Sequence, residues 1–278
     1  MKKIAVTGAT GQVGKELVRC LQKKKISNRL LVRDPKKASI QSHPSSTIVS
    51  FDFNNPKTYK SALQGIDRLF LVCASFGANV LSSFMHSAKQ SGIKQIVIMS
   101  GIGADINKKH FLALLEKLVK ESGIPYVALR ANWFFQNFGS LFRNMIKNKH
   151  ELSFPDGRAK LSLVDARDIA EVALHFLCKE IDEKELAYDI TGPEALTHQS
   201  VTKLFSKHLP YEVSYRELTE QQAINELGWD DEWLELFKDI RNGLTSLVSD
   251  SVQKILGKPP RYMEDYIIEN KTLWIDKK

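Results

Sequence analysis

The sequence predicts an α/β fold: a Rossmann-type, doubly wound, mostly parallel sheet with a smaller C-terminal α+β substrate lobe. Three observations predict it. Short apolar runs alternate with amphipathic helical patterns over the first 130 residues. The runs contain few polar residues, as expected for parallel strands that helices cover on both faces. A glycine-rich segment follows the first run and opens the first helical pattern, which is the place of a dinucleotide-binding turn.

Six strands and four helices are expected in this part of the chain. The expected strands lie at residues 3–7, 29–33, 47–51, 68–72, 95–99 and 126–130, and the expected helices at 12–25, 56–63, 80–91 and 108–122. In the first helix, Val13, Leu17 and Leu21 recur at the spacing of one helical face. Right-handed crossovers between the strands would place such helices against the sheet.

The pattern changes after residue 130. We expect helices at 133–147 and 165–178, a hairpin at 152–164 around the turn Pro155-Asp156-Gly157, and a strand at 186–190. The expected domains are an NAD(P)-binding Rossmann domain at 1–150 that also includes 165–190, and a substrate-binding lobe at 191–278 that is interleaved with 151–164.

Composition limits the class of protein. The 278 residues are 43% hydrophobic and 26% charged, as in ordinary soluble chains. No apolar run reaches the roughly 18 residues of a membrane span, and the N-terminus lacks a signal-peptide pattern. We therefore expect a cytoplasmic protein without a membrane partner. The widely spaced Cys20, Cys73 and Cys178 and the scattered histidines predict neither disulfides nor a metal site.

The positive charge is concentrated near the N-terminus. The net charge is +8, and residues 1–50 hold 11 Lys or Arg against 2 Asp or Glu. Such a segment suits nucleic acid or a small phosphorylated ligand. The chain has no recognition-helix or RNA-binding signature, so we do not expect nucleic acid as a partner.

The segment Thr7–Gly14 has the spacing GxxGxxG. Glycines permit a tight turn and let backbone N–H groups approach a pyrophosphate at a helix N-terminus. The last glycine, Gly14, would let the helix pack closely on the sheet. An ordinary glycine-rich turn is the alternative, but the strand–turn–helix context favours a dinucleotide.

Arg33 ends the second expected strand. At this point NAD-specific proteins carry an acid that accepts hydrogen bonds from the ribose. A guanidinium instead binds a ribose phosphate through two hydrogen bonds. Arg33, helped by Lys37, therefore favours NADP(H) over NAD(H), and a solvated basic loop is the alternative.

Seven motifs along the whole chain match one family pattern. They are Thr7–Gly14, Leu31–Arg33, Phe51–Phe53, Ser122–Arg130, Asn132–Phe138, Val164–Ala170 and Leu256–Arg261. The chain thereby resembles the NmrA-like branch of the atypical short-chain dehydrogenase/reductase superfamily. Within that branch it is most similar to NADPH-dependent quinone reductases and triphenylmethane-dye reductases.

The resemblance implies a cofactor site at the carboxyl ends of the strands. The implied residues are Gly8, Thr10, Gly11, Gln12 and Val13 at the pyrophosphate, Arg33 at the 2′-phosphate, Asp52 and Phe53 beside adenine, Cys73, Ala74 and Ser75 along the sugar, and Ser100, Ala131, Asn132 and Phe134 around the nicotinamide. Near the expected cleft, Phe76 and Phe135 are candidates to stack on a flat substrate, with core packing as the alternative for each. Cys73 is expected to be a small buried hydrophobe, with a redox-sensitive thiol as the alternative.

No catalytic residue is assigned. Short-chain dehydrogenases commonly use a Tyr-x-x-x-Lys pair as proton donor, and no tyrosine lies between Phe70 and Tyr126. Hydride transfer to a ketone leaves an alkoxide, whose conjugate acid has a pKa of about 16, close to that of water. Transfer to a quinone leaves a phenolate-type anion, with a pKa of about 10 by analogy with tyrosine. The difference of about 6 units is worth about 8 kcal/mol.

These arguments predict an oxidoreductase that transfers hydride from NADPH to an electron-poor conjugated acceptor such as a quinone. The alternative is a non-catalytic NADP(H)-binding redox sensor with a regulatory role, which the missing proton donor fits equally well. The expected partner is a small-molecule acceptor, and the expected assembly is a monomer or homodimer.

Overall fold

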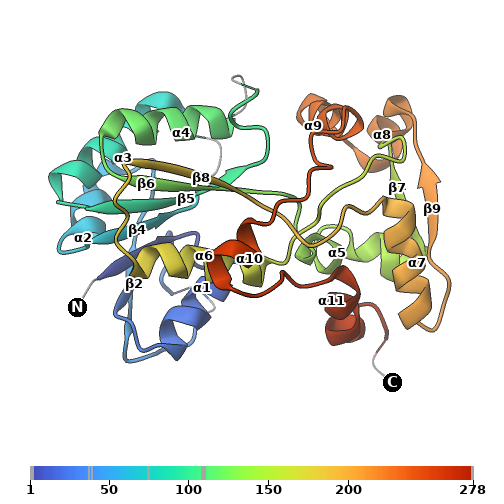
Figure 1. Cartoon of the computed structure of the whole chain (residues 1–278), viewed down its shortest axis with the longest axis horizontal. Helices are drawn as coiled ribbons and strands as arrows, with labels where there is room; N and C mark the ends of the chain where they lie inside the picture. Colours follow the sequence, from blue (N-terminus) through green and yellow to red (C-terminus); the bar gives the residue numbers. More distant parts are fainter. Residues whose placement is uncertain (1–2, 37, 39, 74–75, 108–110, 277–278) are drawn as a thin grey trace. The chain divides into compact units, whose positions relative to one another are not determined.

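The computed structural model describes residues 3–36, 38, 40–73, 76–107 and 111–276. The chain forms two compact units (Figure 1). The first unit comprises Met1–Ala131 and Ala166–Asp189, and the second comprises Asn132–Asp165 and Ile190–Lys278. In this division the first segment of the first unit ends at Ala131, whereas the sequence analysis placed that boundary at residue 150.

A seven-stranded sheet forms the centre of the first unit, with the order β3-β2-β1-β4-β5-β6-β8. Its strands are β1 Ile4–Thr7, β2 Asn28–Val32, β3 Ser46–Ser50, β4 Arg68–Leu71, β5 Gln95–Gly101, β6 Tyr126–Ala131 and β8 Glu185–Ile190. The pairings from β3 through β6 are parallel. The predicted Rossmann-type α/β fold is confirmed.

Helices cover both faces of this sheet (Figure 1). Helices α1 (Gln12–Lys23) and α6 (Ala166–Cys178) lie on one face. On the other face lie α2 (Tyr59–Leu63), preceded by the 3₁₀ turn η1 (Pro56–Thr58), α3 (Ala78–Gln90) and α4 (Phe111–Ser122). All four residues of β1 are buried, which explains its uninterrupted apolar run.

The order of the strands reverses at β1, because β2 and β4 flank it on opposite sides. In open α/β sheets, ligands bind in the crevice at such a switch point, beyond the carboxyl ends of the strands. The loops after β1, β2 and β4 therefore mark the place to look for a site.

The second unit contains a two-stranded parallel sheet of β7 (Glu151–Phe154) and β9 (Ser214–Glu217). The remaining elements are α5 Gln136–Gly139, the π-helix η2 Met145–Lys149, α7 His198–His208, α8 Glu220–Leu227, α9 Asp231–Arg241, α10 Ser251–Leu256, α11 Met263–Asn270 and η3 Lys271–Leu273. Their core is rich in aromatic residues, including Phe138, Phe154, Phe205, Phe237 and Trp274.

Two local predictions in this unit are wrong. The expected helix at 133–147 is broken into α5 and later helical turns. The expected hairpin at 152–164 does not form, because β7 pairs with β9 and the chain beyond the turn bridges to other segments. Leu161 pairs with Leu196, and Val164 pairs with Phe134. The local turn signal at Pro155-Asp156-Gly157 did not reveal these distant partners. In the described part of the chain, no helix is long and apolar enough to cross a membrane.

Candidate functional site

The glycine turn joins β1 to α1. Gly8 has φ of +62°, and the Gly11 N–H donates to the Gly8 carbonyl at 2.9 Å. A Cβ on Gly14 would lie 2.0 Å from the Gly8 carbonyl oxygen, far inside contact distance. The turn therefore needs glycine at Gly8 for its backbone angle and at Gly14 for the close approach of the helix.

A threonine fixes the two strand ends beside this turn. The Thr7 hydroxyl donates to the Val72 carbonyl at 2.8 Å and accepts from the Val72 N–H at 2.7 Å. The loops after β1 and β4 are therefore held side by side at the switch point of the sheet.

A cavity of about 380 Å³ opens at these strand ends. It is lined by Thr7, Gly8, Thr10, Leu31, Val32, Arg33, Phe51, Asp52, Phe53, Asn54, Val72 and Phe76. The structure thus brings together five predicted cofactor residues from three loops: Gly8, Thr10, Arg33, Asp52 and Phe53. The sequence analysis did not assign the other residues that line this cavity, although their place near the ends of the strands was a usable signal. They are Thr7, Leu31, Val32, Phe51, Asn54 and Val72.

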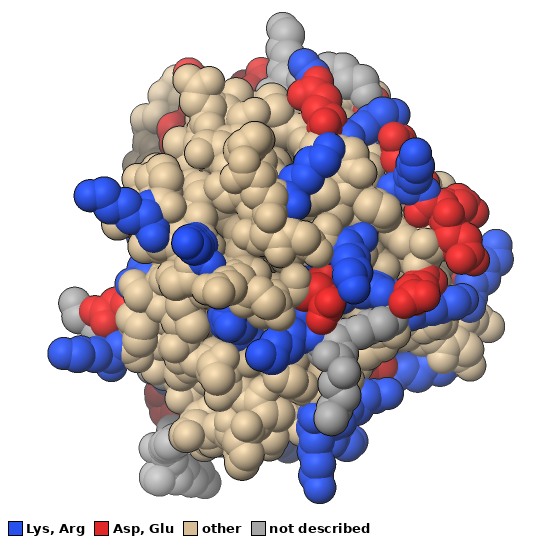
Figure 2. Space-filling model, turned by 90° about the vertical axis from the view of Figure 1, so that its left-hand side faces the viewer, with Lys and Arg blue, Asp and Glu red and all other residues tan. Residues whose placement is uncertain are grey.

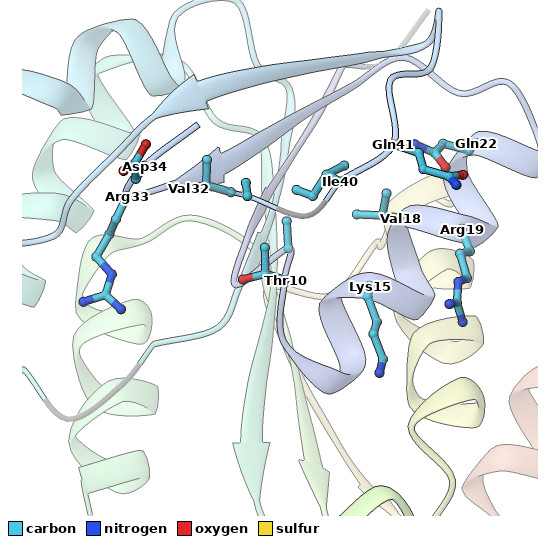
Figure 3. Close-up of a pocket in the computed structure, with 12 residues that line it drawn as sticks. Thr10, Lys15, Val18, Arg19, Gln22, Val32, Arg33, Asp34, Ile40 and Gln41 are labelled. Carbon is cyan, nitrogen blue, oxygen red and sulfur yellow. The ribbon is translucent and has the colours of Figure 1, made fainter. Parts of the chain in front are cut away.

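Arg33 lies on the wall shared by this cavity and a second one of about 970 Å³. The second cavity is also lined by Lys15 and Arg19, which extend from α1 (Figure 3). In the same view, the side chains of Arg33 and Asp34 point away from each other. The Arg33 side chain is exposed and has no hydrogen-bond or ion-pair partner among the described residues. It is available to an anionic ligand.

Asp52 and Phe53 also line the smaller cavity. One Asp52 carboxylate oxygen accepts the Asn54 N–H at 2.9 Å, which leaves its other oxygen without a partner in the described chain. The Tyr59 hydroxyl donates to the Phe53 carbonyl at 2.5 Å and so holds the loop that contains Asp52 and Phe53. Burial, followed by the charge of Asp52, raises the pKa of Tyr59, so this hydroxyl stays protonated as a donor.

Phe76 belongs to this same cavity. Its ring lies against Phe53, with ring centroids 4.9 Å apart. The ring lines the cavity that also holds Arg33 and Asp52, the residues implied to face the adenylate half, and its stacking on the substrate stays a prediction. Nearby, burial raises the pKa of the Cys73 thiol to about 12, so Cys73 is neutral at ordinary pH.

Ser100 lies at the carboxyl end of β5 within a buried polar network. Its hydroxyl donates to Glu116 Oε1 at 2.5 Å. Arg130 donates to both oxygens of the same carboxylate, through Nε at 3.0 Å and Nη2 at 2.8 Å. These hydrogen bonds, with Glu116 as the main cause, raise the pKa of Arg130. The predicted site residue Ser100 is thus tied to two residues that the sequence analysis did not assign.

The Asn132 side chain is held by three hydrogen bonds within the second unit. Its amide nitrogen donates to Ser162 Oγ at 2.7 Å and to the Thr245 carbonyl at 2.8 Å. Its amide oxygen accepts the Trp133 N–H at 2.8 Å, and the residue is buried. The amide thus connects segments of the second unit, and the implied place of Asn132 beside the nicotinamide stays a prediction.

Phe134 and Phe135 differ in burial. Phe135 is 1% exposed and packs beside Tyr266 in the core of the second unit. The expectation that it stacks on the substrate is corrected, because its ring has almost no free surface. Phe134 is only half-buried, and its implied contact with the nicotinamide stays a prediction.

The other predicted positions are placed as follows. Gly11 is the N-cap of α1, and Gln12, its first residue, is half-buried. Val13 is buried, so it would reach a ligand only through its backbone. Ala131 is buried at the end of β6. The predicted residues Lys37, Ala74 and Ser75 lie outside the described residues.

On the face shown in Figure 2, Lys and Arg side chains are dispersed among uncharged ones. Among the described residues, no group of three or more His, Cys, Asp or Glu could hold a metal ion.

Comparison with known proteins matches this architecture to named relatives. The chain is 32% identical over 280 residues to an NAD(P)H azoreductase of Xenophilus azovorans, covering 95% of this chain and 96% of the relative. A crystal structure of an NADPH-dependent quinone oxidoreductase of Escherichia coli, complexed with NADPH, superimposes with a TM-score of 0.84 at 24% identity, covering 96% of this chain and 99% of that one.

A third similarity is to a protein described differently. NmrA, a negative transcriptional regulator solved in complex with NADP, has a TM-score of 0.78 at 19% identity, covering 97% of this chain and 95% of that one. The likenesses to these two structures show a shared fold. The model of the NmrA-like family matches residues 1–246, and this chain therefore belongs to the NmrA-like family.

Proposed function

We propose that this protein is an NADPH-dependent reductase of electron-poor conjugated acceptors such as quinones. The observation that carries the proposal is the cavity at the switch point, where the glycine turn, the Asp52–Phe53 loop and Arg33 converge. The Arg33 side chain has no partner among the residues that the structure describes. The azoreductase relative, which aligns over nearly the whole chain, supports the reductase class.

The residues present fit a dinucleotide phosphate. The steric requirement at Gly14 and the positive end of α1 suit a pyrophosphate near Gly8–Val13. Arg33 would bind the 2′-phosphate, and Asp52 with the rings of Phe53 and Phe76 would receive the adenine. The bound cofactor would supply the hydride. The task of these side chains is to bind and orient it.

The chemistry of the acceptor follows from the residues near Ser100. The Tyr-x-x-x-Lys pair is absent from the sequence, and the Ser100 proton is already donated to Glu116. A site without a side-chain proton donor favours acceptors whose reduced anion is stable in water. This favours a quinone over a simple ketone by about 8 kcal/mol.

The first test measures loss of reduced-nicotinamide absorbance with a benzoquinone, a naphthoquinone, a triphenylmethane dye, an azo dye, a saturated ketone and no acceptor. We expect turnover with the conjugated acceptors, little with the ketone, and a preference for NADPH over NADH. Faster reduction of the ketone would contradict the proposal. Tight NADPH binding without turnover on any acceptor would support an NADP(H)-binding regulator instead.

The cofactor preference is tested with Arg33→Ala. We expect NADPH affinity to fall about ten- to hundredfold, the range of a hydrogen-bonded contact to a charged group, while NADH affinity stays unchanged. The matched control is Lys60→Ala, which removes one exposed positive charge from α2. Equal losses for NADPH and NADH in Arg33→Ala would show that Arg33 does not select the phosphate.

A further inference from the structure

The Ser100 network leaves one direction open for hydrogen bonding. Glu116 is 9% exposed and Ser100 is 4% exposed, so both are shielded from bulk water. Three donors, one from Ser100 and two from Arg130, share the two oxygens of Glu116. A carboxylate paired in this way with a guanidinium only accepts hydrogen bonds.

A serine hydroxyl has one proton and two lone pairs. The proton of Ser100 lies on the 2.5 Å bond to Glu116 Oε1. The remaining capacity of this oxygen is therefore to accept a hydrogen bond. Ser100 is the last but one residue of β5, and in open α/β sheets ligands bind beyond the carboxyl ends of the strands. A carbonyl or anionic oxygen next to Ser100 Oγ would be repelled by its lone pairs, whereas an N–H group could donate a hydrogen bond to them.

Arg130 holds the Glu116 carboxylate in place. Its Nη1 is 2.8 Å from Asp105 Oδ2, in addition to the two bonds to Glu116. Such a buried carboxylate would be costly without this pairing. The guanidinium thus fixes both the charge and the orientation of the group that takes the Ser100 proton.

We propose that Glu116 is a positioning residue: it turns Ser100 into a hydrogen-bond acceptor for the carboxamide N–H of the bound nicotinamide. This inference rests on the proposed NADP(H) site and on the place of Ser100 near its nicotinamide end. On this proposal, Ser100 orients the nicotinamide ring and does not protonate the substrate.

The test compares the affinity for NADP⁺ with that for its acetylpyridine analogue, in which a methyl ketone replaces the carboxamide and the pyridine ring carries no N–H donor. Calorimetric titration gives both dissociation constants without requiring turnover. We expect wild-type protein to bind the analogue about two- to tenfold more weakly, the range of one neutral hydrogen bond. Ser100→Ala should abolish this discrimination.

Glu116→Gln should also reduce the discrimination, because its amide has one acceptor oxygen for three donors. In the Ser100→Ala background it should have no further effect, since Glu116 acts through Ser100. Glu116→Asp keeps the charge but retracts the carboxylate, and it serves as the second variant if Glu116→Gln unfolds. Asp105→Asn, which changes only the exposed partner of Arg130, is the control and should retain the wild-type discrimination.

Full discrimination in Ser100→Ala, or equal effects of the Glu116 variants with and without Ser100, would overturn the proposal and leave Glu116 a purely structural ion pair. Protein that binds and discriminates the dinucleotides but reduces no acceptor would contradict the proposed reductase function and support this inference. Failure of the folded wild type to bind NADP⁺ would overturn both.

Discussion

The turn after β1 and the segment after β6 both carry predicted cofactor residues, but they are built differently. Around the first turn, Gly14 has no room for a side chain, and the Arg33 side chain is exposed and unpaired among the described residues. In the second segment, the Asn132 amide makes three hydrogen bonds to other parts of the protein and the Phe135 ring is buried. A sequence motif therefore predicts ligand contacts better where its residues are small or exposed. It predicts them less well where the side chains can be buried or hydrogen-bonded within the protein.

The largest effect should separate the two neighbouring phenylalanines. Phe135→Ala should lower the free energy of unfolding by about 3–5 kcal/mol, because it opens a cavity in the aromatic core. Phe134→Ala, at the half-buried neighbour, should cost less than half as much and should change KM for the acceptor instead. Urea unfolding and steady-state kinetics measure the two effects. Equal loss of stability in both variants would remove this distinction.

Next in size is Gly14→Ala, which tests the turn after β1. The new Cβ would lie 2.0 Å from the Gly8 carbonyl oxygen, and backbone has to move to relieve the clash. We expect a loss of about 3 kcal/mol in stability, at the upper end of overpacking, together with loss of NADPH binding. The control is Gly77→Ser: its Cβ meets no atom within 4 Å, and its hydroxyl can cap α3. Unchanged NADPH affinity in folded Gly14→Ala would argue against a dinucleotide at this turn.

Asn132→Ala should be slightly milder. It removes three hydrogen bonds and leaves the Trp133 N–H without its acceptor, while the Ser162 hydroxyl keeps its bond to the Thr245 carbonyl. We expect about 2 kcal/mol lower stability with little change in the dissociation constant of NADPH. Thermal unfolding and calorimetric titration measure the two quantities. The reverse pattern, stable protein with weakened binding, would restore Asn132 as a ligand-contacting residue.

The smallest effect concerns Cys73. Because burial raises its pKa to about 12, the thiolate fraction at pH 8 is only about one in ten thousand. We expect alkylation of Cys73 to be slow at pH 8 and to rise with pH, while the exposed Cys178 reacts quickly. Peptide mass mapping over time distinguishes the two thiols. Fast labelling of Cys73 that NADPH slows would instead indicate the redox-sensitive thiol.

The sequence by itself determined the parallel α/β fold, the glycine turn and the placement of Arg33 at the end of β2. These features depend on interactions within a few residues: apolar periodicity sets the elements, and the lack of a Cβ sets the turn. The order of motifs along the chain also sufficed to indicate the family.

Only the tertiary structure decided the parallel pairing of β7 with β9, the partners of Asn132 and the network of Ser100. The Asn132 amide bonds to residues 30 and 113 positions away, and Ser100 bonds to a residue 16 positions away on another element. Such contacts depend on which strands become neighbours and in which register, and no local pattern encodes that. For the same reason, an amide or an aromatic ring in a motif acquires a structural or a ligand-binding role only when the chain has folded around it.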